Sequence, residues 1–270
     1  MLQFPAIDPV AVSIGPISIH WYGISYLIGI GLGWLYLLKT KHKNSEFLDA
    51  EVVSDLVFYA AIGAVLGGRL GYAIFYNFPV TISNPLSLFA VWQGGMSFHG
   101  GVLGFIVAML LFARRREMKF LNVTDFVVRA VPIGLFFGRI ANFVNQELWG
   151  APTKLPWGVL FTHPGAGGVA RHPSQLYEAI LEGIVLFFIL WMLAQRPRAL
   201  GMISASFLFF YGLFRFLVEF IREPDQHIGY LLGEWLTMGQ VLSSPMIFCG
   251  MVLAVLAWKN FFASKSSTPQ

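Results

Sequence analysis

The sequence has few charged residues. Asp, Glu, Lys and Arg make up 12% of its 270 residues, about half the share that is usual in soluble domains, while 56% of the residues are hydrophobic. Together with a mean hydropathy of +0.67, this composition excludes an ordinary soluble domain and predicts a polytopic membrane protein. The net charge of +4 does not indicate a nucleic-acid partner, because the basic residues form short clusters between apolar runs.

Cysteine is also scarce, and the common catalytic motifs are missing. The single cysteine, Cys249, excludes an internal disulfide, and its apolar surroundings (MIFCGMVLAVLAW) predict a buried, inert thiol. The sequence has no HExxH, GxSxG, P-loop or paired metal-ligand spacing, which argues against a zinc protease, a common serine hydrolase and an ATPase. We therefore expect neither a metal nor a cofactor. The first basic residue is Lys39, so the sequence does not predict a cleavable signal peptide.

Apolar runs of near-spanning length occupy most of the chain. The fold class that they predict is all-α, a single integral-membrane domain with seven transmembrane helices and no internal repeat. Residues 1–20 contain three prolines and are expected to form a periplasmic surface arm, residues 21–262 the bundle, and residues 263–270 a cytoplasmic tail. The predicted spans are Trp21–Leu38, Leu56–Tyr76, Phe98–Ala113, Phe126–Val144, Leu176–Ala194, Met202–Arg222 and Val241–Phe262.

Basic residues follow the odd-numbered spans. On that side lie eleven of the 18, namely Lys39, Lys41, Lys43, Arg114, Arg115, Arg116, Lys119, Arg196, Arg198, Lys259 and Lys265. The opposite side has an uncharged loop at 77–97 and a long loop, Asn145–Gln175, whose only basic residues are Lys154 and Arg171. It also has an acidic loop with Glu223, Asp225 and Glu234. By the positive-inside rule, the N-terminus is periplasmic and the C-terminus cytoplasmic.

The segment Gly138–Gly150, GRIANFVNQELWG, places polar residues at the end of an apolar helix. An arginine at membrane depth is costly unless it faces a wet or paired interior, so it is a functional candidate. Arg139 and Asn142 are three residues apart and share a helix face, with Gln146 one turn further along. The alternative is a structural arginine paired with a neighbouring helix.

A second polar face lies in the sixth span. In YGLFRFLVE, Tyr211, Arg215 and Glu219 share one helix face, and we expect Glu219 to hold Arg215. Glu178 and Glu182 repeat this spacing and could pair with Arg69 or Arg139, although ion pairs that only fasten helices would show the same pattern.

The predicted topology places these groups together. Nearly all strongly polar residues of the spans fall in the outer half of the membrane, which indicates a cavity open to the outer leaflet. Two arginines at one depth suit a phosphate, since a guanidinium binds phosphate oxygens in pairs.

The glycine-rich stretch GGMSFHGGVLG allows close approach to a neighbour or ligand. His99 within it could act as a base, or could be a structural hydrogen-bonding residue. Ser174 is expected to cap the fifth span.

Taken together, these motifs resemble the prolipoprotein diacylglyceryl transferases of bacterial inner membranes. Gly138–Gly150 is similar to the family signature G-R-x-G/A-N-F-x-N-x-E-x-x-G at every fixed place. HWYG, GGRLGY, HGG, RHPSQLYE and YGLFRFLVEFIREPD also resemble blocks of that family, in its order, so that the resemblance covers essentially the whole chain.

The resemblance implies a transfer of the diacylglyceryl group of phosphatidylglycerol to the lipobox cysteine of a prolipoprotein signal peptide, without metal or cofactor. It implies a multi-pass protein of the inner membrane with its site toward the periplasmic leaflet. Arg139 and Arg215 would neutralise the phosphate, His99 would be the base, and Glu147 and Glu219 would position the arginines. The predicted site is His99, Arg139 and Arg215 as catalytic residues, with Tyr22, Arg69, Asn142, Asn145, Glu147, Gly150, Tyr211 and Glu219 as substrate-binding residues.

Two other classes of protein compete with this interpretation. A transporter for an anionic solute would also use arginines at one depth, but it would have pseudo-symmetric halves, whereas an odd number of spans is predicted. A membrane receptor or scaffold would explain neither the arginine pair nor the HGG turn.

Overall fold

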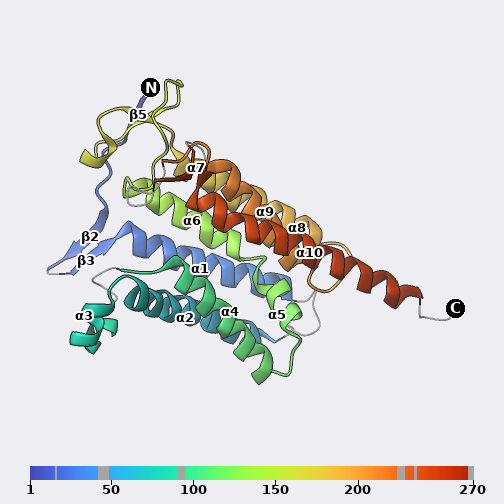
Figure 1. Cartoon of the computed structure of the whole chain (residues 1–270). Helices are drawn as coiled ribbons and strands as arrows, with labels where there is room; N and C mark the ends of the chain where they lie inside the picture. The colour runs from blue at the N-terminus through green and yellow to red at the C-terminus, as the bar shows by residue number, and fades with distance from the viewer. Residues whose placement is uncertain (16, 42–48, 90–94, 224–228, 234–235, 267–270) are drawn as a thin grey trace. The chain divides into compact units, whose positions relative to one another are not determined.

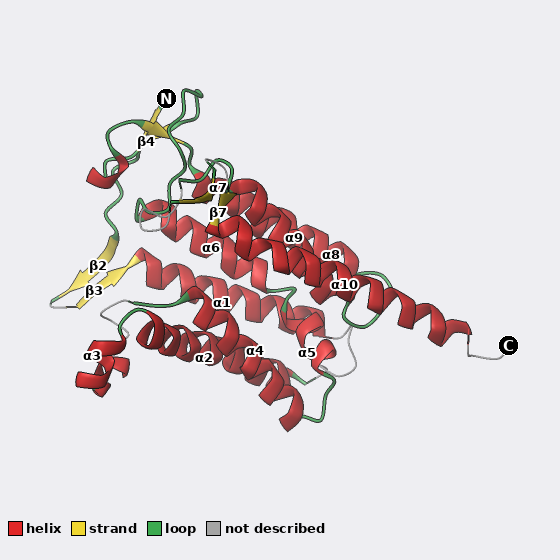
Figure 2. Cartoon of the chain, in the orientation of Figure 1, coloured by secondary structure: helices red, strands yellow, loops and turns green. Residues whose placement is uncertain are grey.

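The computed structural model describes residues 1–15, 17–41, 49–89, 95–223, 229–233 and 236–266, and it is mostly helical (Figures 1 and 2). Its contacts divide the chain into two compact units, Met1–Gly33 with Val128–Gln270, and Trp34–Val127. We call them the first and the second unit and describe each by itself. Lys43, Asp225 and Glu234, which entered the charge argument, lie outside the described residues.

The second unit is built around two closely packed helices. It contains the end of α1 (Trp21–Thr40), α2 (Ala50–Phe75), α3 (Phe78–Ser83), η3 (Pro85–Phe89), α4 (Phe98–Arg115) and α5 (Phe120–Val127). α2 and α4 touch through glycines, because a Cβ at Gly104 would lie 2.7 Å from the Cα of Gly67, and one at Gly71 would lie 2.7 Å from the Cα of Gly100. The close approach expected of the glycine-rich stretch is therefore an approach to a neighbouring helix.

The first unit holds the remaining helices. They are the start of α1, α6 (Val131–Val144), α7 (Ser174–Glu178), η6 (Ala179–Val185), α8 (Leu186–Ala194), α9 (Met202–Val218) and α10 (Met238–Ser266). α7, η6 and α8 form one continuous helix whose middle, η6, has the wider π-helical turn. α9 packs along α10, and η6 packs on α6, where a Cβ at Gly183 would lie 2.7 Å from that of Phe136 (Figure 1).

Short strands in the first unit depart from the all-α prediction (Figure 2). β1 (Leu2–Gln3), β4 (Val159–Leu160) and β5 (Ala170–Arg171) form a small sheet in which β1 is parallel to β4. Two hairpins join β2 (Val10–Ile14) to β3 (Ile17–His20) and β6 (Tyr230–Leu232) to β7 (Leu236–Thr237). Strands this short carry too few residues for alternation to be recognised in the sequence.

All seven predicted spans are helical over most of their length. Among the described residues, five helices are long and apolar enough to cross a membrane, and the number is six if α5 and α6 count as one span. α6 begins with Pro132 in its first turn, where the missing N–H is tolerated. The sixth predicted span, Met202–Arg222, is too long, because α9 ends at Val218 after 17 residues.

Two local predictions are wrong. Cys249 is exposed on α10 instead of buried, because an apolar helix that is long enough to cross a membrane can present apolar residues to lipid as well as to the protein. Ser174 does not cap the fifth span, since Pro173 occupies the cap position and Ser174 is the first helical residue. The serine hydroxyl donates instead to the carbonyl of Leu148, 2.8 Å away.

Candidate active site

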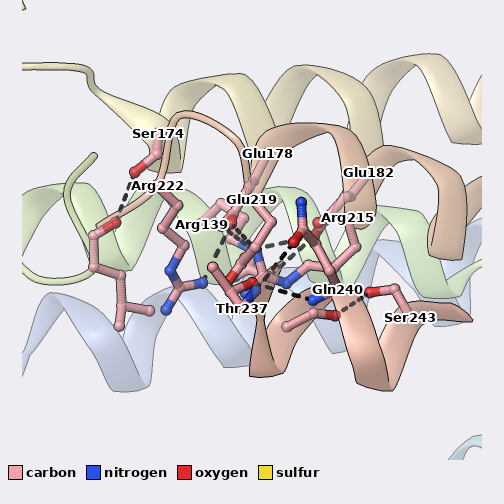
Figure 3. Close-up of polar contacts among 12 residues, drawn as sticks. Arg139, Ser174, Glu178, Glu182, Arg215, Glu219, Arg222, Thr237, Gln240 and Ser243 are labelled. Atoms are coloured by element: carbon pink, nitrogen blue, oxygen red, sulfur yellow. Dashed lines mark hydrogen bonds and ion pairs between the residues drawn. The ribbon is translucent and has the colours of Figure 1, made fainter. Parts of the chain in front are cut away.

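A buried glutamate joins three arginines in the first unit (Figure 3). Glu178, at the end of α7, has no exposed surface. Its Oε2 lies 3.0 Å from Nε of Arg139. Its Oε1 lies 2.9 Å from Nη1 of Arg215 and 3.4 Å from Nη1 of Arg222. One carboxylate therefore gathers cations from α6, from α9 and from the turn after α9.

Two further carboxylates complete this cluster. Glu182 accepts from Nε and Nη2 of Arg139 at 3.2 and 3.0 Å. Glu219 lies 2.7 Å from Nη1 of Arg215, as the i, i+4 spacing predicted. Three guanidinium groups thus face three buried carboxylates, which we call the arginine–glutamate cluster: Arg139, Glu178, Glu182, Arg215, Glu219 and Arg222. Its formal charges balance, and this balance lets it persist in an apolar interior.

Two arginines of the cluster, Arg139 and Arg215, keep part of their donor capacity toward the described carboxylates. Both contacts of Arg215 with the described carboxylates use Nη1, and those of Arg139 use Nε and Nη2. The side chains of Arg139 and Arg215 are 15% and 16% exposed, whereas Glu178 and Glu182 are completely covered. The arrangement can therefore offer N–H donors to an anion while its carboxylates stay behind the arginines.

The signature segment ends α6 with a left-handed turn. The amide of Glu147 donates to the carbonyl of Asn142 at 3.0 Å, and that of Gln146 donates to the carbonyl of Phe143 at 3.0 Å. This is the Schellman pattern, with Gln146 (φ 53°) at the position where glycine is usual. Leu148 is left-handed as well (φ 60°). The turn brings the Glu147 carboxylate to 2.7 Å from Nδ2 of Asn142.

Glu147 was expected to position an arginine, and this role stays a prediction. Among the described residues, its carboxylate accepts a hydrogen bond from the amide of Asn142. The side chain of Tyr22, in the first turn of α1, lies within electrostatic range of Asn142 and Glu147, and its hydroxyl lies 3.4 Å from that of Tyr26. Tyr22 is placed there because α1 packs tightly on α6, where a Cβ at Gly29 would lie 3.1 Å from the Cα of Gly134.

Gly150 lies where the signature meets the turn after α9. A Cβ there would lie 2.5 Å from the carbonyl oxygen of Ile221 and 2.7 Å from the Cβ of His172. The Gly150 amide donates to the carbonyl of His172 at 2.8 Å, and Gly150 also forms a β-bridge with Arg222. Only glycine fits this close approach, which holds the backbone of Arg222 in place within the cluster.

Arg171 and His172 fasten the loop that follows. Arg171 donates to the carbonyl of Gly150 at 3.2 Å and pairs with Glu223 at 2.6 Å, which also accepts from the Trp149 indole at 2.9 Å. Burial lowers the pKa of the His172 imidazole from its ordinary value.

Tyr211 and Asn145 accompany the cluster. Tyr211 is buried on α9 within electrostatic range of Arg139 and Glu182. Asn145 ends α6, and its buried Oδ1 has no hydrogen-bond partner among the described residues.

Arg69 and His99 belong to the second unit. Arg69 donates to the carbonyls of Ser87, Leu88 and Gly95 at 2.5, 3.0 and 3.0 Å, so it fastens the segment after α2. His99 is exposed in the first turn of α4, beside Phe98. Their expected roles, substrate binding and proton acceptance, stay predictions.

Glu178, Glu182 and Arg222 were missing from the predicted site. The signals that could have found them are two glutamates at i, i+4 in an apolar helix, and an arginine seven residues after Arg215. Among the described residues, no group of three or more His, Cys, Asp or Glu side chains could hold a metal ion.

Comparison with known proteins identifies the family of the chain. The sequence model of the family described as prolipoprotein diacylglyceryl transferase matches residues 9–256. The phosphatidylglycerol–prolipoprotein diacylglyceryl transferase of Methylococcus capsulatus is 53% identical over 260 residues, which are 96% of this chain and 98% of that protein. The transferases of the same name from a Marinomonas species and from Pseudomonas aeruginosa are each 51% identical, over 99% and 96% of this chain and 99% and 97% of their own lengths. The chain belongs to the prolipoprotein diacylglyceryl transferase family.

Proposed function

We propose that the protein transfers the diacylglyceryl group of phosphatidylglycerol to the lipobox cysteine thiol of a prolipoprotein, the first step of lipoprotein maturation. The observation that carries this proposal is the arginine–glutamate cluster, in which Glu178 holds three guanidinium groups together. The names of the relatives supply the two substrates.

The reaction displaces a phosphate from a glyceryl carbon. The thiolate sulfur forms a bond to that carbon, and the carbon–oxygen bond to the phosphate breaks with its electron pair staying on oxygen. The products are a thioether and glycerol phosphate, and the thiol proton must leave. The phosphodiester, which carries one negative charge, becomes a monoester that takes up a second as the bond breaks.

The cluster suits this change in charge. Partly exposed guanidinium groups of Arg139 and Arg215 offer donors to the phosphate, and a charge that grows in the transition state gains most from donors that are already oriented. Glu178, Glu182 and Glu219 supply that orientation by holding the other edges of the guanidinium groups. Tyr22 and the hydrogen-bonded pair of Asn142 and Glu147 form a second polar group for the glycerol head.

The thiol must be deprotonated, because the thiolate is the nucleophile and an ordinary cysteine has a pKa of about 8.5. We assign the role of proton acceptor to His99. Nearby arginines also favour the thiolate by their charge.

We further propose that the chain crosses the bacterial inner membrane seven times, with its N-terminus and its site on the periplasmic side. The distribution of lysine and arginine supports this orientation. A site on the periplasmic side would be accessible to phosphatidylglycerol from the outer leaflet and to the signal peptide of an exported prolipoprotein.

The proposal is tested by incubating the detergent-purified protein with phosphatidylglycerol and a lipobox peptide and then weighing the peptide. We expect the peptide to gain the mass of one diacylglyceryl group, and to gain nothing when the cysteine is replaced by serine. No mass gain with the intact peptide would refute the proposal.

A further inference from the structure

We infer that Ser174 and Gln175 are positioning residues of the transferase site. Their side chains hold the left-handed turn of the signature in place. They thereby fix the position of the Asn142–Glu147 contact relative to the arginine–glutamate cluster. The kinetic consequences rest on the proposed function, whereas the structural ones do not.

The turn is held at two successive carbonyls. Nε2 of Gln175 donates to the Glu147 carbonyl at 2.6 Å, and the Ser174 hydroxyl donates to that of Leu148 at 2.8 Å. Both donors are fully buried. Leu148 has φ 60°, a conformation that costs an L-residue energy and persists only where its surroundings impose it. The two hydrogen bonds flank this strained residue, so they impose it.

The same short helix carries the centre of the cluster. Ser174 and Gln175 precede Glu178 by four and three residues, and therefore share its side of α7. On α6, Asn142 follows Arg139 by three residues in the same way. The two helices are thus linked twice, by the Arg139–Glu178 pair at 3.0 Å and by the contacts of Ser174 and Gln175 with the turn.

A substitution at Gln175 can distinguish a positioning role from a role in stability alone. Its Oε1 is buried without a hydrogen-bond partner among the described residues. A buried unpaired acceptor is destabilising. Methionine has a similar volume and would remove both the donor and this acceptor. Gln175→Met therefore exchanges one unpaired acceptor, Oε1 of Gln175, for another, the released Glu147 carbonyl, and its net effect on stability should be small.

The kinetic test uses the full-length protein with phosphatidylglycerol and a lipobox peptide. For the Ser174→Ala, Gln175→Met double variant we expect kcat to fall about 10- to 100-fold, as for a small misplacement of reacting groups, with a melting temperature close to that of the Ser174→Ala single variant. Ser174→Thr keeps the hydroxyl and should restore most of the rate lost in Ser174→Ala. Ser206→Ala is the matched control, because its hydroxyl also donates to a backbone carbonyl, that of Met202 within α9, and it should keep the wild-type kcat.

Hydrogen–deuterium exchange tests the positioning claim without any substrate. In the double variant, the amides of Glu147 and Gly150 should exchange faster. They donate to the carbonyls of Asn142 and His172, and these hydrogen bonds should open more often once the turn is released. The exchange of the α9 amides should not change. Unchanged exchange of these two amides, or a kcat within about twofold of the wild type, would overturn the inference. If these amides exchange faster in the double variant but the wild type modifies no peptide, the result would support the positioning of the turn and refute only the transferase proposal.

Discussion

At the scale of single residues, the charges of the arginine–glutamate cluster depend on one another. Glu178 forms ion pairs with three arginines, and Arg139 forms ion pairs with two glutamates. Removing one member leaves a buried partner without its counter-charge, which costs more than the pair itself contributes. Substitutions that keep charge or shape therefore separate the roles of the members better than truncation does.

Arg139→Lys should lower kcat/KM by at least about 100-fold, the usual cost of losing an oriented donor to a developing charge. A lysine ammonium is a single point and cannot contact Glu178 and Glu182 while also facing a phosphate, as the guanidinium fork does. Arg139→Ala and Arg215→Ala should abolish turnover. Peptide modification followed by mass spectrometry measures each rate.

The matched control is Arg116→Lys, since Arg116 forms an ion pair with Asp55 that is partly exposed on both sides. It should be as active as the wild type. Wild-type activity in Arg139→Lys would contradict the assigned role of the guanidinium.

Glu178→Gln should destabilise the protein by about 3 kcal/mol or more, the typical cost of breaking a buried ion pair. The amide keeps the shape of the carboxylate, but it offers one acceptor and turns a donor toward the remaining arginines. Thermal unfolding in detergent measures the loss. Asp55→Asn, in the partly exposed pair with Arg116, should unfold close to the wild-type temperature.

Protonation of His172 should oppose folding. Its pKa is lowered in the folded state, so the unfolded chain binds the proton first as the pH falls through the ordinary histidine pKa of about 6.5. Stability is therefore highest above that pH and declines below it until the folded-state pKa is reached. His172→Asn should show a flatter dependence of melting temperature on pH between about 7 and 5, and an identical dependence would exclude this residue as a cause.

At the scale of elements, small residues decide how closely helices approach. Gly104→Val should lower the stability of the second unit by about 1–3 kcal/mol, since its Cβ would lie 2.7 Å from the Cα of Gly67 and the helices α2 and α4 would have to separate. Thermal unfolding in detergent measures this change as well. Gly31→Ala on α1 is the control, because a Cβ there meets no atom within 4 Å, and it should be neutral or slightly stabilising.

The sequence predicted what helix geometry alone determines. The Arg215–Glu219 pair follows from a spacing of four residues on one helix. It did not predict that Glu178 contacts Arg215 and Arg222, because contacts between helices depend on how they pack. Nor did it predict the Glu147–Asn142 contact, which requires two left-handed residues, Gln146 and Leu148, in a turn where no glycine marks them.

At the scale of the whole molecule, the spans are less uniform than their hydropathy suggests. Among the described residues, five or six helices meet the length and composition of a span, and α9 has 17 residues. The polar end of the sixth predicted span leaves the helix after Val218 and forms the turn that carries Arg222. The helix of the sixth predicted span is therefore shorter than expected, and Arg222 lies in the turn that follows it.

The proposed orientation predicts which loops an impermeant thiol reagent reaches in intact cells. In a Cys249→Ala background, Lys154→Cys should be labelled from outside, and Lys119→Cys should be labelled only after the membrane is permeabilised. Both positions are exposed. Labelling of Lys119→Cys in intact cells would reverse the orientation and contradict the periplasmic site.

The sharing of Glu178 among three guanidinium groups has a consequence for how this protein can diverge. A single change of sign at any member leaves an unmatched charge in an apolar interior, so such steps should be eliminated before a second change can compensate them. We expect strong epistasis among these six positions, and in a deep mutational scan the rare functional charge changes there should occur as coupled pairs.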